Sequence, residues 1–300
     1  MGRTAQLFSN LLPGDMRMTN IGETWGASAV PPAFDNMATA AAIPAGESRQ
    51  LCVTLLSPYL AQSKYISLGI IPLVLELEVG ESDDCFDGTG NSWEITRPRL
   101  CASVVELDTQ LQNSYSSHIL SGKSLPFLCD GLYSLKAAVT STNIFSFPLT
   151  RGFTRLKTIY ITFWDGTGKW ITNFYHPRNA GVNTANLDNM EWTVTLGGDR
   201  YPVFACESAQ ESFYRLRLCE QAHGSSGPSF TPHQYYSGGK FVIGQNLELA
   251  PGSAHTGLNT RSGSQMTLQF KNITGAVTIH VVLKYEVVVN VSAAGTQLLD

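Results

Sequence analysis

Alternation between hydrophobic and polar positions is the clearest regular pattern in this chain. A period of two residues is typical of a β-strand with one face in a core. Pro72 lacks a backbone N–H, so the strand predicted over residues 65–79 should start, bulge or lie at a sheet edge there. Its alternating apolar positions are Leu73, Leu75, Leu77 and Val79. Further strands are predicted at 51–56, 99–107, 143–149, 156–164, 191–196, 240–243, 266–271 and 276–291.

Two segments change to the period of a helix. Leu111, Tyr115 and Ile119 recur at every fourth position between Asp108, a good N-cap, and Gly122, a common helix stop, which predicts a helix over 109–121. Ser208-Ala-Gln-Glu211 matches a capping box and predicts a second helix that runs to about His223. Many strands with only two helices favour an all-β fold of jelly-roll sandwiches over a parallel β/α fold.

The length of 300 residues suits two medium-sized domains. Residues 1–48 are rich in Ala, Pro, Gly and Asn with little periodicity, which predicts an irregular N-terminal arm. Residues 49–125 are predicted to form a first, partial jelly roll and a linker helix. Residues 126–300 are predicted to form a second jelly roll, so that the two sandwiches follow each other in tandem.

Four segments of the chain resemble, in order, four motifs of one protein family. Residues 49–56 and 68–79 resemble the paired strands PLxFWF…ALPLIALxYxEV. Residues 99–108 and the helix after them resemble LxVDYVxLDxxER, with matches at Leu100, Val105, Leu107 and Asp108. Residues 147–163 resemble FxHPVKELxWVxQ, and residues 240–250 with 256–263 resemble YSFALxPExxQPSGxxNFSR. The order is that of the double jelly-roll major capsid proteins of large eukaryotic DNA viruses, virophages and polinton-like viruses.

This resemblance implies a structural protein of the virion rather than an enzyme. Its trimers would form pseudo-hexagonal capsomers of an icosahedral DNA virus shell, in contact with neighbouring capsomers and with minor capsid proteins. The chain departs from the family in two places. Thr54-Leu55-Leu56 stands where the family has FWF, and the 48 residues before this segment are fewer than the family carries there. We therefore expect a shortened first roll.

Composition excludes two kinds of partner. The net charge is -4 and Lys and Arg form no cluster, so direct nucleic-acid binding, which needs clustered positive charge, is not expected. Charged residues interrupt the apolar runs at 65–79 and 276–291, among them Lys284 and Glu286, and neither run supplies the ~20 apolar residues of a membrane helix. Residues 1–8 lack a signal-peptide core, which indicates synthesis in the host cytoplasm.

An acidic, glycine-containing loop at residues 83–94 partly matches a calcium-binding loop. Asp83, Asp87, Gly88 and Glu94 fall at its positions 1, 5, 6 and 12. Position 3, however, is Cys85, a poor ligand for Ca²⁺, and the flanks are predicted as strands rather than helices. A solvated acidic turn is the favoured interpretation, and calcium binding stays open.

No catalytic, cofactor-binding or metal-ligating residue is predicted. The histidines form no HxH or HxxxH pair, and the cysteines form no CxxC pair and are expected to be reduced core residues. The histidines are His118, His176, His223, His233, His255 and His280, and the cysteines are Cys52, Cys85, Cys101, Cys129, Cys206 and Cys219.

An aromatic-rich stretch motivates an alternative function. Aromatic rings can stack on sugars, so a carbohydrate-binding or adhesive β-sandwich protein is the alternative to a capsid protein. Core packing is the favoured interpretation of these side chains, because aromatic residues are enriched in sheets and dominate core burial. The stretch consists of Phe153, Tyr160, Phe163, Trp164, Trp170, Phe174 and Tyr175.

Overall fold

The computed structural model divides into two compact units, one formed by Met1–Leu60 and Asp130–Glu286 (unit 1) and one formed by Ala61–Cys129 and Val287–Asp300 (unit 2). Strands β1 (Leu125–Val139) and β8 (Val277–Ser292) contribute residues to both units. The structure describes residues 46, 48, 57–61, 64–69, 72–76, 78, 92–139, 144–164, 190–222, 235, 241–250, 253–261, 263, 265–273 and 277–300.

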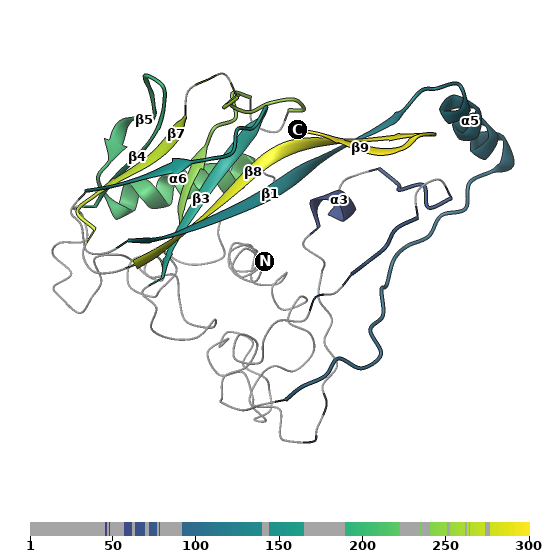
Figure 1. The fold of residues 1–300 in the computed structure, drawn as a ribbon, viewed down its shortest axis with the longest axis horizontal. Helices are drawn as coiled ribbons and strands as arrows, with labels where there is room; N and C mark the ends of the chain where they lie inside the picture. Colours follow the sequence, from purple (N-terminus) through teal and green to yellow (C-terminus); the bar gives the residue numbers. More distant parts are fainter. Residues whose placement is uncertain are drawn as a thin grey trace. The chain divides into compact units, whose positions relative to one another are not determined.

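Strands β1 to β8 are divided between two sheets (Figure 1). The five-stranded sheet has the order β1-β8-β3-β6, with β9 paired to β8, and the four-stranded sheet has the order β2-β7-β4-β5. Successive strands therefore lie in opposite sheets except β4 and β5, which pair with each other, and the first strand lies beside the eighth. This is the topology of a jelly roll. The remaining strands are β2 (Ile144–Leu149), β3 (Leu156–Trp164), β4 (Glu191–Leu196), β5 (Asp199–Cys206), β6 (Ile243–Asn246), β7 (Met266–Lys271) and β9 (Gly295–Leu299).

The core lies between the two sheets, and large side chains on neighbouring strands form rows that line it. In the four-stranded sheet, Phe145 and Trp192 are both register partners of Phe270, so three large aromatic residues form one row. Phe270 also meets Phe163 of the five-stranded sheet edge to face, with ring centroids 5.7 Å apart. Such aromatic pairs stabilise beyond the area they bury. The two sheets are thus packed as a β-sandwich, which confirms the predicted all-β class.

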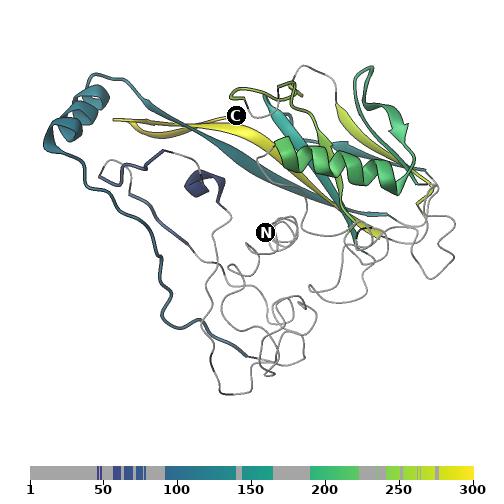
Figure 2. The same ribbon diagram turned by 180° about the vertical axis from the view of Figure 1, so that it is seen from behind.

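Helix α6 (Ala209–Ala222) joins both sheets of the sandwich (Figure 2). The Ser208 hydroxyl accepts a hydrogen bond from the Glu211 backbone N–H at 3.1 Å, so the predicted N-cap is confirmed. On the four-stranded sheet, Trp192 Nε1 donates to Ser212 Oγ at 2.9 Å. On the five-stranded sheet, a Cβ on Gly244 would lie 2.9 Å from Leu216 Cδ1, so only glycine admits the helix at this distance.

Unit 2 contains helix α5 (Thr109–Leu120), which confirms the predicted helix. Asp108 occupies the predicted N-cap position, and its carbonyl oxygen accepts a hydrogen bond from the Gln112 backbone N–H at 2.9 Å. Its side chain, however, makes no capping hydrogen bond. Ile119 is buried, whereas Leu111 and Tyr115 are 46% and 40% exposed. The apolar stripe of this helix is therefore only partly covered. A single helical turn, α3 (Pro58–Ala61), completes the helices of the described residues.

The predicted strands before α5 differ from the structure. Described residues 64–69, 72–76, 78 and 92–108 are neither helix nor strand. Alternation defines a hydrophobic face, but a strand also needs a neighbour for its backbone hydrogen bonds. None of the described residues before β1 therefore belongs to a strand. Residues 1–45, 49–56 and 79–91 lie outside the described residues. The N-terminal arm, the first roll and the domain boundaries stay predictions.

Candidate functional site: a charge network across three strands

A buried carboxylate on β8 organises a network of charged side chains within the sandwich. The Glu286 side chain is 0% exposed and accepts a hydrogen bond from Arg155 Nη1 at 3.0 Å. The backbone N–H of Glu286 donates in turn to the carbonyl oxygen of Arg155 at 3.0 Å. His255 adds two contacts, a backbone N–H 2.9 Å from Oε2 and a ring Nδ1 3.0 Å from Oε1. A charge buried this deeply persists only when it is paired and hydrogen-bonded, as it is here.

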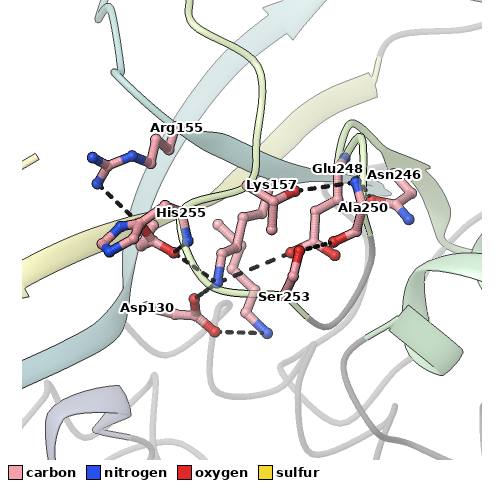
Figure 3. A network of polar contacts seen from close by, with 11 residues as sticks. Asp130, Arg155, Lys157, Asn246, Glu248, Ala250, Ser253 and His255 are labelled. Carbon is pink, nitrogen blue, oxygen red and sulfur yellow. Dashed lines mark hydrogen bonds and ion pairs between the residues drawn. The ribbon is translucent and has the colours of Figure 1, made fainter.

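Lys157 lies at the centre of the network (Figure 3). Its Nζ is 2.7 Å from Asp130 Oδ1 on β1, 3.8 Å from Glu286 Oε2 and 4.0 Å from Glu248 Oε1. Lys284 Nζ contacts the other oxygen of Asp130 at 3.1 Å. Cations therefore alternate with carboxylates, and the network links β1, β3, β8 and the segment that follows β6.

Asp130 is ionised at neutral pH. Burial alone would raise the pKa of its carboxyl group, but the nearby charges of Lys284 and Lys157, with a hydrogen bond from each, outweigh burial and lower the pKa below its ordinary value of 3.8. Asp130 thus remains a negative bridge between β1 and its two neighbouring lysines.

The segment 253–261 is fastened to the start of β3 by backbone contacts as well. Leu156 and Leu258 exchange two backbone hydrogen bonds of 2.9 and 2.8 Å, and the Thr260 N–H donates to the Phe153 carbonyl oxygen at 2.8 Å. Gly257 has φ +135°, and a Cβ there would lie 2.9 Å from the backbone carbonyl carbon of Arg155. Glycine is therefore required for this close approach.

Aromatic rings surround a further cation beside the network. The guanidinium carbon of Arg151 lies 4.9, 5.0 and 5.1 Å from the ring centroids of Tyr133, Phe153 and Tyr285. Cation–π contacts of this length contribute about 0.5–2 kcal/mol each, depending on exposure. They connect β1, β8 and the chain just before β3, as the ion pairs do.

The network is suited to hold chain segments together. Each carboxylate of Asp130 and Glu286 already faces two or more cationic groups, so their charges are used within the protein. Sequence reasoning did not single out these residues as a site. The available signal was the interruption of the apolar run 276–291 by Lys284 and Glu286, which marked charges inside an otherwise buried strand.

The predicted candidate sites have different outcomes. Phe153, Tyr160 and Phe163 are buried, which confirms core packing for these three aromatic residues and removes them as sugar platforms. Trp170, Phe174 and Tyr175 lie outside the described residues, as does the acidic loop except for Ser92–Glu94. Calcium binding by that loop therefore stays open.

Two of the cysteines have the predicted environment. Cys206 and Cys219 are buried and form no disulfide. Cys101 is exposed, so its prediction as a core residue is wrong. Burial, together with the nearby charge of Glu211, raises the pKa of the Cys206 thiol despite its hydrogen bond with Ser212. The thiol is thus protonated and unreactive at neutral pH.

The described part of the chain contains neither a membrane-spanning helix nor a cluster of metal ligands. None of its helices combines the length and apolar character needed to span a membrane. Its His, Cys, Asp and Glu side chains form no group of three or more placed to hold a metal ion.

The chain is similar to known proteins only in comparison with solved structures. No family model and no curated protein matches the chain. The chain is similar to PBCV-1 VP54 fitted into a reconstruction of the virophage Sputnik, with 14% identity and a TM-score of 0.41 over 65% of this chain and 55% of that one. It is also similar to the PBCV-1 virus capsid (13%, 0.41, 65% and 55%) and to the Sputnik virophage structure (12%, 0.33, 59% and 38%).

All three matches are to structures of a virus or a virophage. The matched region spans about 55% of the length of the first two chains. Their identities are 14% or less and their TM-scores are below 0.5. The fold of this chain is therefore assigned from its own strand order.

Proposed function

We propose that this protein is a structural capsid protein whose trimers form pseudo-hexagonal capsomers of an icosahedral DNA virus shell. In this proposal the chain acts in the virion, through contacts with its own copies, neighbouring capsomers and minor capsid proteins, without catalysis or direct nucleic-acid binding.

One observation carries the proposal. The two family-like segments in the second half of the chain, 147–163 and 240–263, lie far apart in sequence but are bonded together. β3 pairs with β6, the Leu247 N–H donates to the Lys157 carbonyl oxygen at 2.8 Å, and Leu258 is bonded to Leu156. The motifs thus belong to one jelly roll, as the resemblance requires, and are not unrelated apolar runs.

The charge network supports a mechanical role. A shell subunit must keep its strands in place while its sides press against other subunits, and Glu286, Asp130 and Lys157 tie three strands and a loop together. In this proposal the buried ion pairs favour one arrangement of strands, because an arrangement that separates them leaves a buried charge unpaired. The sugar-binding alternative has no comparable support, since three of its aromatic residues are in the core.

Light scattering coupled to size-exclusion chromatography, over a dilution series, tests the proposal. We expect a particle of about three times 32.6 kDa that persists on dilution. Negative-stain images should show particles with three-fold symmetry and a pseudo-hexagonal outline. A protein that remains monomeric at every concentration would contradict the capsomer function.

A further inference from the structure

Strand β9 is a short sheet edge that carries no charge, no proline and no bulge. Natural edge strands carry charges, prolines or bulges, are very short, or are covered. β5 has Pro202 and a register shift against β4, β2 has Pro148, and β1 has Pro126. β6 is a short strand of four residues whose Gly244 lies under α6. β9, Gly295-Thr-Gln-Leu-Leu299, has no charge and no proline, and all five residues are exposed.

Within the described part of the chain, β9 pairs with β8 alone. Ser292 and Gly295 close a two-residue turn, and hydrogen-bonded and non-hydrogen-bonded pairs then alternate along the hairpin. The backbone groups of Gly295, Gln297 and Leu299 therefore face β8. Those of Thr296 and Leu298 point to the outer edge, where only another extended backbone matches their spacing.

We propose that β9 pairs antiparallel with β9 of a second copy of this chain, so that the β8–β9 ribbon continues from one molecule into the next. With Gln297 opposite its own copy, Thr296 of one chain faces Leu298 of the other, and the outward groups of both strands meet. Because β9 is uncharged, this self-pairing brings no like charges together. Leu298, 71% exposed in the single chain, gains a neighbour across the new pair.

A cysteine at the centre of the pairing tests its register. In a non-hydrogen-bonded antiparallel pair the Cα atoms are about 4.5 Å apart, within the range of a disulfide. We expect Gln297→Cys to give disulfide-linked dimers under mild oxidation. The matched control Gln269→Cys, on an exposed position of β7, and the wild type with its exposed Cys101 should not. Equal cross-linking in Gln297→Cys and Gln269→Cys would overturn the proposal.

A proline distinguishes backbone pairing from side-chain contact. Leu298→Pro removes an outward N–H but keeps the groups that bond β8, whereas Leu298→Ala removes only the side chain. We expect the wild type and Leu298→Ala to double in particle mass as concentration rises, and Leu298→Pro to lose this step. Two results would overturn the proposal. One is a wild type whose particle mass does not double, as expected if a different protein occupies the edge. The other is a doubling that persists in Leu298→Pro.

The outcome is independent of the capsomer function. If the smallest particle is a monomer, edge pairing gives a dimer. If it is a trimer, edge pairing first joins two trimers and leaves further β9 edges that can join more. Should Leu298→Pro fail to fold, amide hydrogen exchange of the wild type decides. The Thr296 and Leu298 amides must then become protected at high concentration only, while the Gln297 amide is protected throughout.

Discussion

Units 1 and 2 contain the same alternating hydrophobic pattern, but its apolar side chains are mostly buried in unit 1 and mostly exposed in the part of unit 2 before α5. In unit 1, apolar positions of neighbouring strands face one another, as Leu268 does with Phe147 and Val194, and Leu268 and Val194 are fully buried. In unit 2, Leu73, Val74 and Leu75 are 42%, 84% and 44% exposed, although their spacing is equally strand-like. Most of the exposed large apolar side chains lie in unit 2. The difference shows that alternation marks a face, and that only a facing strand buries it.

The largest expected effect comes from truncating one leucine in each unit. Leu268→Ala leaves a cavity in the sandwich and should lower the free energy of unfolding by about 4 kcal/mol. Leu68→Ala, at a side chain that is 55% exposed, should change it by less than about 0.5 kcal/mol. Urea denaturation followed by circular dichroism measures both. Equal losses would show that unit 2 buries its apolar residues after all.

A second comparison sets a buried carboxylate against an exposed one. Glu286→Gln leaves Arg155 without its charged partner and should lower the free energy of unfolding by about 3 kcal/mol. This loss is near the low end for a broken buried pair, because Lys157 retains its ion pair with Asp130. Glu191→Gln removes the partner of Lys271 on the outer face of β4 and β7, at a cost below about 1 kcal/mol. The same denaturation experiment applies. Similar losses would contradict a structural role for the Glu286 network.

Two glycines with positive φ separate backbone strain from crowding. Gly257→Ala and Gly263→Ala both force a left-handed conformation, at about 1–2 kcal/mol. Only at position 257 does the new Cβ meet backbone atoms, which should add about 1 kcal/mol. Thermal and urea unfolding of the two variants give the difference. No difference would mean that segment 253–261 can move away from Arg155 without cost.

The helix caps offer a smaller contrast between the units. Ser208→Ala removes a capping hydrogen bond of α6 and should destabilise by about 1 kcal/mol. Asp108→Ala, before α5, removes a side chain without such a bond and should cost less than about 0.5 kcal/mol. Helical signal and unfolding midpoint report both changes. A larger loss in Asp108→Ala than in Ser208→Ala would show that the Asp108 side chain does stabilise the start of α5.

The last prediction is that the contribution of Asp130 to stability is lost in acid. The folded pKa of Asp130 is lowered, so its contribution to stability is fully present above its ordinary pKa of 3.8 and is lost as pH falls through the folded pKa. Wild type should therefore exceed Asp130→Asn in urea midpoint at pH 7, and the gap should close as the pH falls well below 3.8. A gap that does not change with pH would show that the Asp130 charge does not bridge Lys157 and Lys284.

The elements predicted correctly have a strong local period. β3, β4 and β7 have the predicted bounds, and β8 and α6 differ by one residue at either end. β6 begins where the strand predicted at 240–243 ends. The sequence pattern missed β1, β5 and β9. In β1 and β5 the alternation is broken by Asp130 and Gly131 and by Pro202, and β9 is short and half polar.

The candidate site was harder to predict because its members are distant in sequence. Asp130, Lys157 and Glu286 come from three strands that are neighbours only after the jelly roll has formed. Each alone is an ordinary charged residue, and none belongs to a motif with a fixed spacing. The order of the family-like segments indicated which strands exist, but the pairing of β3 with both β6 and β8 placed the charges together.

The sequence by itself determined the all-β class, two helices and most strands of the sandwich, because these follow from short-range periodicity and capping residues. Only the tertiary structure decided the strand order, the charge network around Glu286 and the exposure of the apolar positions in unit 2. The physical reason is that burial and ion pairing are contacts between distant segments, whereas a local period records only the face that each segment offers.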